Sequence, residues 1–139
     1  MSLKENICSF GVTKSVNNNC LSASVLSITA FKYKTDVEQF GKERAFFADE
    51  TFFYRYSDCE DRAILYSVLV RDLLGLDVVL LHYPLHLATA VRFESDVVGD
   101  HIAIDGVKYT VCDPTYIGAP IGDLASKYKR SKVEVIKIQ

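Results

Sequence analysis

The longest apolar pattern in the chain follows a cysteine at position 59. In residues 63–74 apolar side chains occupy nearly every face of a helix, and Gly75 is suited to end that helix in a left-handed conformation. Ser57 or Asp58 can cap its start, with an acidic residue three positions later as the capping-box partner. The pattern therefore predicts a buried helix with Cys59 in its first turn.

After Gly75 the pattern changes to that of β-strands. Residues 76–83 are apolar and rich in β-branched side chains, and Pro84 ends this strand. A second strand is predicted over 86–93, and it runs antiparallel to the first because only two residues separate them.

A tight hairpin is predicted further along the chain. Asp105-Gly106 is the strongest short turn signal in the sequence, and it joins strands predicted over 101–104 and 107–112. A last strand is predicted over 133–138.

The N-terminal part has a weaker pattern. Leu21, Val25 and Ile28 recur at helical spacing and predict a helix over about 20–31. Residues 31–56 are expected to form a loop folded against the body, either as a cleft wall or through ordinary aromatic packing. This segment is dense in aromatic residues: Phe40, Phe46, Phe47, Phe52, Phe53 and Tyr54.

These elements predict an α+β fold, with helices first and then an antiparallel sheet of about four strands. At 139 residues, 49% of them apolar, the chain can bury the core of one domain spanning 1–139, and a second domain is not expected.

Charge and hydropathy exclude several partners. A net charge of −2 without a basic stripe argues against a nucleic acid or an anionic membrane, and the short basic segment 127–132 is interpreted as a solvated turn. No apolar run is long enough to span a membrane, and no secretory leader is evident. The start Met1-Ser2-Leu3 is compatible with a domain excised from a longer chain, so localisation stays open.

The four cysteines, Cys8, Cys20, Cys59 and Cys112, lack the paired spacing of a disulfide framework, although a bridge from Cys8 to Cys20 stays open for an exported protein. Cys20 and Cys112 are interpreted as small buried hydrophobic residues. Cys59 differs because the partial positive charge at a helix N-terminus favours a thiolate.

Three reactive side chains fall at the ends of predicted elements. Cys59 begins the helix, His86 begins a strand and Asp113 follows the end of another. If those strands are antiparallel neighbours, His86 and Asp113 meet, and the helix can present the sulfur to the other imidazole nitrogen. This is the arrangement of nucleophile, base and orienting carboxylate.

The motifs around these residues resemble those of the transglutaminase-like cysteine protease superfamily, of the bacterial type. They are SDCEDRA at 57–63, HLATAV at 86–91 and YTVCDPTY at 109–116, and the resemblance covers about 54–122. It implies a papain-like α+β core and the cleavage or exchange of amide bonds through a thioester.

By this resemblance Cys59 is the nucleophile, His86 the general base and acid, and Asp113 the residue that orients the imidazole. The family often has Gly where Ser57 stands. The chain also lacks the Trp with which cross-linking animal enzymes stabilise the oxyanion, which favours hydrolysis over transfer to an amine.

The expected substrate is an amide of a peptide or protein, and no cofactor is expected. Substrate contacts are predicted for Tyr83, Tyr116, Tyr54 and Asp58. The backbone N–H of Cys59 is the expected oxyanion donor, with a second donor from the segment 54–58.

Two readings stay open besides that of an amine-accepting acyltransferase. One is the same fold with catalysis lost, serving as a peptide-binding or interaction module. The other is zinc bound by His82 and His86 with Cys59 or Cys112, which the spacing disfavours because the two histidines would lie about 13 Å apart on a strand. No metal site is therefore predicted.

Overall fold

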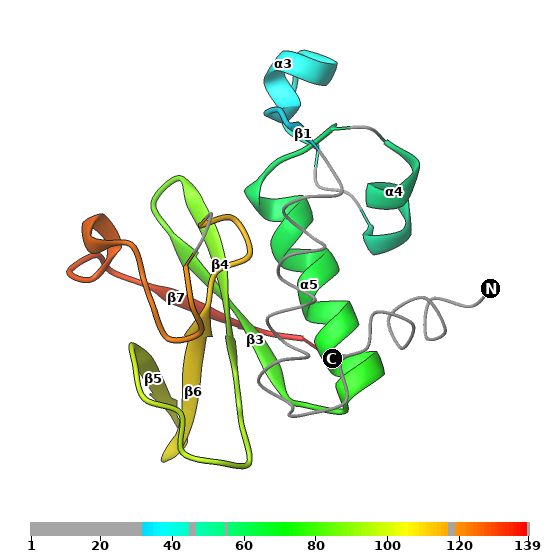
Figure 1. The fold of residues 1–139 in the computed structure, drawn as a ribbon. Helices are drawn as coiled ribbons and strands as arrows, with labels where there is room; N and C mark the ends of the chain where they lie inside the picture. The colour runs from blue at the N-terminus through cyan, green and yellow to red at the C-terminus, as the bar shows by residue number, and fades with distance from the viewer. Residues whose placement is uncertain (1–31, 45–46, 55, 117–118, 139) are drawn as a thin grey trace.

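The computed structural model describes residues 32–44, 47–54, 56–116 and 119–138 and has an α+β architecture (Figure 1). The predicted helix over 20–31 and the candidate bridge from Cys8 to Cys20 lie outside these ranges. No helix within them is long and apolar enough to cross a bilayer. The elements in chain order are β1 (Lys32–Tyr33), α3 (Asp36–Phe40), α4 (Ala48–Phe53), β2 (Tyr56–Ser57), α5 (Cys59–Leu74), β3 (Val78–Tyr83), β4 (His86–Val91), β5 (His101–Ile104), β6 (Val107–Cys112), the 3-10 turn η1 (Ser126–Tyr128) and β7 (Glu134–Lys137).

Helix α5 begins and ends where its sequence signals predict. Asp58 is the N-cap, and its Oδ1 accepts hydrogen bonds from the backbone N–H of Glu60 at 3.0 Å and of Asp61 at 3.2 Å. Asp61 completes the capping box by accepting from the Asp58 N–H at 3.1 Å. Gly75 ends the helix with φ of 68°. This confirms the predicted helix, with Cys59 as its first residue.

The main sheet is antiparallel and has five strands in the order β5-β6-β4-β3-β7, rather than about four. The fifth strand, β7, comes from the end of the chain and pairs with the edge of β3, with Leu80 opposite Ile136. Its residues are mostly exposed. A short exposed strand carries little hydrophobic signal of its own, and its partner is set by the tertiary fold.

Helix α5 packs along β3 and β4, so one of the two hydrophobic clusters of the core lies between the helix and the sheet (Figure 1). The helix has almost no exposed face over its middle turns. This cluster contains Leu65, Tyr66, Leu69, Val70, Leu76, Val78, Val91 and Cys112, and the second contains Val79, Leu81, Tyr83, Ala88, Ala90, Val111 and Leu124.

The expectation of a loop over 31–56 is wrong for most of the described part of that segment. Strand β1 pairs in parallel with β2, and α3 and α4 lie between them in the chain, near the N-terminal end of α5 (Figure 1). Helix α3 has its own capping box between Thr35 and Glu38 and stops at Gly41. Elements this short have no apolar periodicity to reveal them, so local capping was the available signal.

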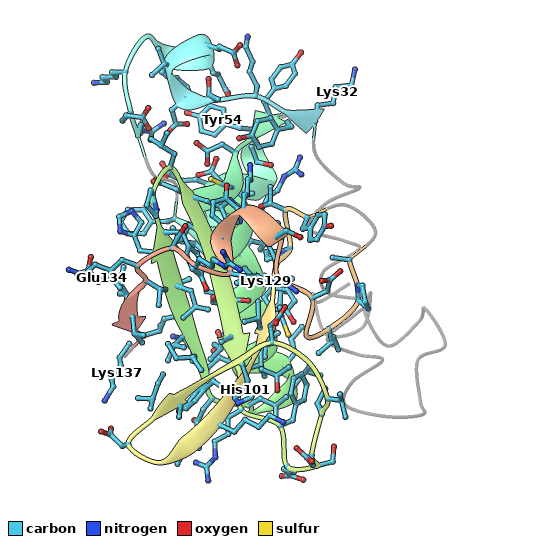
Figure 2. The ribbon with its side chains drawn as sticks, turned by 90° about the vertical axis from the view of Figure 1, so that its left-hand side faces the viewer. Lys32, Tyr54, His101, Lys129, Glu134 and Lys137 are labelled. Carbon is cyan, nitrogen blue, oxygen red and sulfur yellow. The ribbon has the colours of Figure 1, made fainter. Side chains whose placement is uncertain are left out.

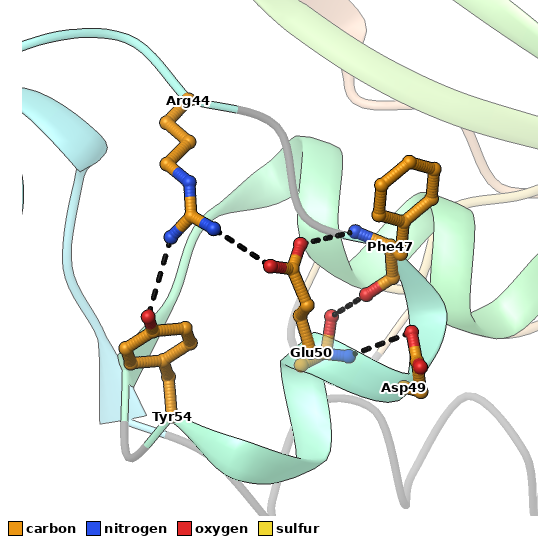
Figure 3. A network of polar contacts seen from close by, with 6 residues as sticks. Arg44, Phe47, Asp49, Glu50 and Tyr54 are labelled. Atoms are coloured by element: carbon orange, nitrogen blue, oxygen red, sulfur yellow. Dashed lines mark hydrogen bonds and ion pairs between the residues drawn. The ribbon is translucent and has the colours of Figure 1, made fainter.

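Helix α4 is held by a network around Glu50 (Figure 3). Its carboxylate accepts hydrogen bonds from the Phe47 N–H at 2.9 Å and from the Arg44 guanidinium at 2.6 Å. Arg44 also donates to the Tyr54 hydroxyl at 3.3 Å. The network ties both ends of α4 to the chain that precedes it.

Two glycines bring the C-terminal segment against the sheet. A Cβ on Gly99 would lie 2.6 Å from the Gly122 backbone, and a Cβ on Gly122 would lie 2.8 Å from Val98 O. The close approach lets the Asp100 N–H donate to Gly122 O at 2.7 Å and the Gly122 N–H donate to Val111 O at 2.7 Å. The chain that leads into η1 is thereby fixed to β6.

We expect Gly122→Ala to lower the free energy of unfolding more than Gly41→Ala does. Both glycines have positive φ, 83° and 72°, but nothing lies within 4 Å of the Gly41 Cβ position. Left-handed backbone alone costs about 1–2 kcal/mol. The steric contact at Gly122 adds roughly 1–3 kcal/mol. Urea denaturation of both variants measures the difference, and equal losses would contradict the close contact.

Candidate active site

His86 and Asp113 meet at one end of the sheet. Strands β4 and β6 are antiparallel neighbours with Thr89 opposite Cys112, so the start of β4 lies beside the end of β6. The His86 Nε2 lies 2.7 Å from Asp113 Oδ2, and the two side chains are only 10% and 1% exposed. The other Asp113 oxygen accepts from the Thr115 N–H at 3.0 Å, which fixes the orientation of the carboxylate.

Cys59 reaches the same imidazole from the helix. It is a free cysteine, partly exposed, at the first position of α5, and its side chain is close enough to the His86 side chain to help raise the pKa of that imidazole. Because Nε2 is engaged by Asp113, the ring nitrogen left for the sulfur is Nδ1. The three predicted catalytic side chains are thus brought together, with the imidazole between the sulfur and the carboxylate.

The surroundings of the His86 ring favour its protonated form. Burial of the ring opposes a positive charge, but hydrogen bonds to Asp113 and Cys59 and the negative charge of Asp113 outweigh it. Together they raise the pKa of His86 from 6.5 to about 10. The histidine is therefore an imidazolium at neutral pH, able to stabilise a thiolate and to donate a proton.

Ser57, two residues before Cys59, has a structural role of its own. Its side chain is fully buried and its hydroxyl accepts from Arg62 Nε at 3.2 Å. The Arg62 guanidinium lies 5.2 Å from the centre of the Tyr33 ring. Burial lowers the pKa of Arg62, while Tyr33 and Asp58 oppose that change. This contact ties β1 and β2 to the first turn of α5.

The four predicted substrate contacts lie in different settings. Tyr116 is 40% exposed, three residues beyond Asp113, whereas Tyr83 is 5% exposed and is part of a buried cluster. Tyr54 lies in the α3 and α4 region (Figure 2), where its ring meets Phe40 edge to face. Asp58 is buried as the helix cap. Tyr116 is the only exposed one of these four side chains.

Tyr128 is a residue of this site that the sequence analysis missed. It belongs to the basic segment 127–132, which was expected to be a solvated turn. Its ring instead stacks on the His86 ring, with centroids 4.7 Å apart and planes 7° from parallel. The available signal was an aromatic residue among charged ones, which does not identify a partner in the chain.

A group of carboxylates next to the site has the oxygen chemistry of a hard-cation site. Asp36, Asp58 and Asp61 are all buried, and one oxygen from each lies within 4.8 Å of the others. Asp36 Oδ1 has no hydrogen-bond partner, and burial with the charge of Asp36 raises the pKa of Asp58. The backbone N–H groups at the start of α5 and the charge of Arg62 offset part of their repulsion, and a proton or a cation such as Ca²⁺ would offset the rest.

The two histidines of the zinc alternative are not grouped with the cysteines as ligands. His82 is exposed, with Nδ1 3.6 Å from Glu134 Oε2, while His86 Nε2 is engaged by Asp113. Within the described ranges the only set of three or more side chains that could share a metal is the carboxylate group.

No protein-family model matches this chain, and a search of curated proteins finds no match. The chemistry of the site therefore has to be inferred from its own residues.

We expect the contribution of His86 to the free energy of unfolding to decrease as the pH rises from 6.5 to about 10. The folded protein binds the imidazole proton more tightly than the unfolded chain. The contribution is therefore complete below pH 6.5 and is lost as the pH rises through about 10. Denaturation of the wild type and of His86→Gln at several pH values measures it.

Asp113→Asn is the matched control, because it removes the negative charge and keeps the size of the side chain. In the Asp113→Asn background, the effect of His86→Gln on the free energy of unfolding should depend less on pH than it does in the wild-type background. A difference that stays constant from pH 6.5 to 10 in the wild-type background would contradict the assigned charge of His86.

Proposed function

We propose that this protein is a cysteine-dependent amide-bond hydrolase, a peptidase or amidase, with the papain-like core of the transglutaminase-like superfamily. One observation carries the proposal: the His86 Nε2 lies 2.7 Å from Asp113 Oδ2, and the Cys59 side chain, at the start of α5, interacts with the same imidazole. Nucleophile, base and orienting group in contact are the geometric signature of covalent catalysis.

In the proposed reaction the Cys59 thiolate attacks the carbonyl carbon of the amide. The carbon–nitrogen bond then breaks, and the His86 imidazolium gives its proton to the leaving amine. The neutral imidazole next takes a proton from water, and the resulting hydroxide attacks the thioester. The acid leaves, and the thiolate and imidazolium are restored.

The start of α5 supports this reaction by supplying a donor for the oxyanion. The Asp58 carboxylate accepts from the N–H of Glu60 and of Asp61, so it does not engage that of Cys59. The N–H of a first helical residue also needs no partner within its helix. The Cys59 N–H is therefore suited to bind the developing negative charge, assisted by the helix dipole.

Exposure favours a polypeptide substrate that approaches from solvent. Cys59 is partly exposed, whereas Asp113 is buried behind His86. Leu85, directly before His86, and Tyr116, three residues after Asp113, are exposed and are candidates to contact such a substrate. Their apolar and aromatic surfaces would suit an apolar or aromatic side chain of an extended peptide.

Labelling with a peptidyl vinyl sulfone should modify Cys59 and no other described cysteine. We expect the wild type to carry an adduct on Cys59 and Cys59→Ala to carry one adduct fewer, measured by intact mass and peptide mapping. Cys112→Ala is the control that should label normally, since Cys112 is free but buried. Unchanged labelling of Cys59→Ala would sink the assignment of the nucleophile.

Removal of the imidazole should slow both thiol alkylation and turnover. We expect His86→Ala to lower the iodoacetamide rate of Cys59 at neutral pH, and to lower kcat/KM for a peptide amide by on the order of 10²–10⁴. Alanine at the exposed His101 is the matched control. A Cys59 in the wild type that reacts as slowly as an ordinary thiol would instead favour a catalytically silent peptide-binding module.

A further inference from the structure

The C-terminal turn η1 covers one face of the proposed catalytic histidine. Tyr128 lies flat on the His86 ring, with a centroid distance of 4.7 Å and an angle of 7°. An aromatic face attracts a cationic ring placed over it. This contact comes from neither the helix nor the strands that supply Cys59, His86 and Asp113.

Tyr128 also packs on the residue opposite His86. Tyr83 and His86 are the last cross-strand pair before the turn between β3 and β4. The Tyr128 and Tyr83 rings have centroids 5.4 Å apart at an angle of 35°. One side chain therefore holds both members of the pair. His86 is left with its edges on Asp113 and Cys59 and one face on Tyr128.

The segment around η1 is anchored without the help of His86. Asp100 Oδ2 accepts from the Leu124 N–H at 2.9 Å and pairs with Lys129 Nζ at 3.1 Å. Strand β7 then continues along the edge of β3. In Figure 2 the segment that carries Lys129 leads on to Glu134 and Lys137 of β7. The position of Tyr128 is thus set by the fold rather than by a free tail.

Charged and titratable groups reach the imidazole from four elements. Cys59 comes from α5, Asp113 from the end of β6, Tyr128 from η1, and the buried Tyr83 from β3. Lys127 lies next in this shell, with its Nζ 4.9 Å from the centre of the Tyr128 ring, and its charge opposes an imidazolium. The aromatic face of Tyr128 separates the ring of His86 from solvent on that side.

We propose that Tyr128 is a positioning residue, whose ring fixes the plane of the His86 imidazole so that one nitrogen bonds Asp113 while the other faces Cys59. Its effect on turnover rests on the proposed function, but its effect on the histidine does not. The aromatic ring of Tyr128 holds the imidazole in this plane, and the phenol hydroxyl is not needed for it.

The test compares Tyr128→Phe, which keeps the ring, with Tyr128→Leu, which keeps apolar bulk but has no aromatic face. Tyr109→Leu, on β6, is the control, because Tyr109 packs against the same hydrophobic cluster as Tyr128 but lies opposite Ile102 of β5, whereas Tyr128 stacks on His86. The readouts are the His86 pKa from an NMR pH titration of its carbon-bound ring protons, and the pH profile of Cys59 alkylation by iodoacetamide.

We expect Tyr128→Leu to lower the His86 pKa and to slow Cys59 alkylation at neutral pH by roughly 3- to 30-fold, the range of a cation–π contact. Tyr128→Phe and the Tyr109 control should resemble the wild type. A folded Tyr128→Leu with both readouts unchanged overturns the proposal. A Tyr128→Phe variant that behaves like Tyr128→Leu also overturns it, because the hydroxyl, and not the ring, would then produce the effect on His86.

The outcome can be separated from the fate of the proposed function. A lowered His86 pKa in Tyr128→Leu, with no turnover or electrophile labelling by the wild type, supports the positioning role and rejects the hydrolase. Normal turnover by the wild type, with no effect of Tyr128→Leu on kcat or on the pH profile, supports the hydrolase and rejects the positioning role.

Discussion

The antiparallel pairing of β4 with β6 is the constraint on which the site depends. It brings the start of one strand beside the end of the other, so that His86 and Asp113 meet although 27 residues separate them along the chain. The buried carboxylate and the imidazole satisfy each other there. A buried charge without a partner would be costly, so this contact belongs both to the stability of the sheet end and to its chemistry.

Helix α5 adds the sulfur through a different kind of constraint. Its apolar side chains pack on β3 and β4, and its capping box fixes where it begins. Together these two features determine both the height and the direction of Cys59 above the sheet. The start of the helix is supported by the hydrogen bond between Arg62 and Ser57 and by the neighbouring α3–α4 region.

The end of the chain completes the histidine's surroundings. The Gly99–Gly122 approach fixes the segment before η1, and β7 fixes the segment after it. Tyr128 lies between these two anchors and on the imidazole. The short edge strand β7, which has little hydrophobic signal, thereby helps to position the site. The basic turn η1, expected to be solvated, contributes the Tyr128 ring that covers His86.

The sequence by itself determined α5 with its cap and stop, the hairpin at Asp105-Gly106 and the α+β class, because capping, turn chemistry and periodicity act over a few residues. It also indicated Cys59, His86 and Asp113 as candidates from their positions at element ends. Only the tertiary structure decided the neighbours of each strand, the two short helices α3 and α4, and the stacking of Tyr128 on His86. These depend on contacts between distant segments, for which the local pattern of a single sequence carries no signal.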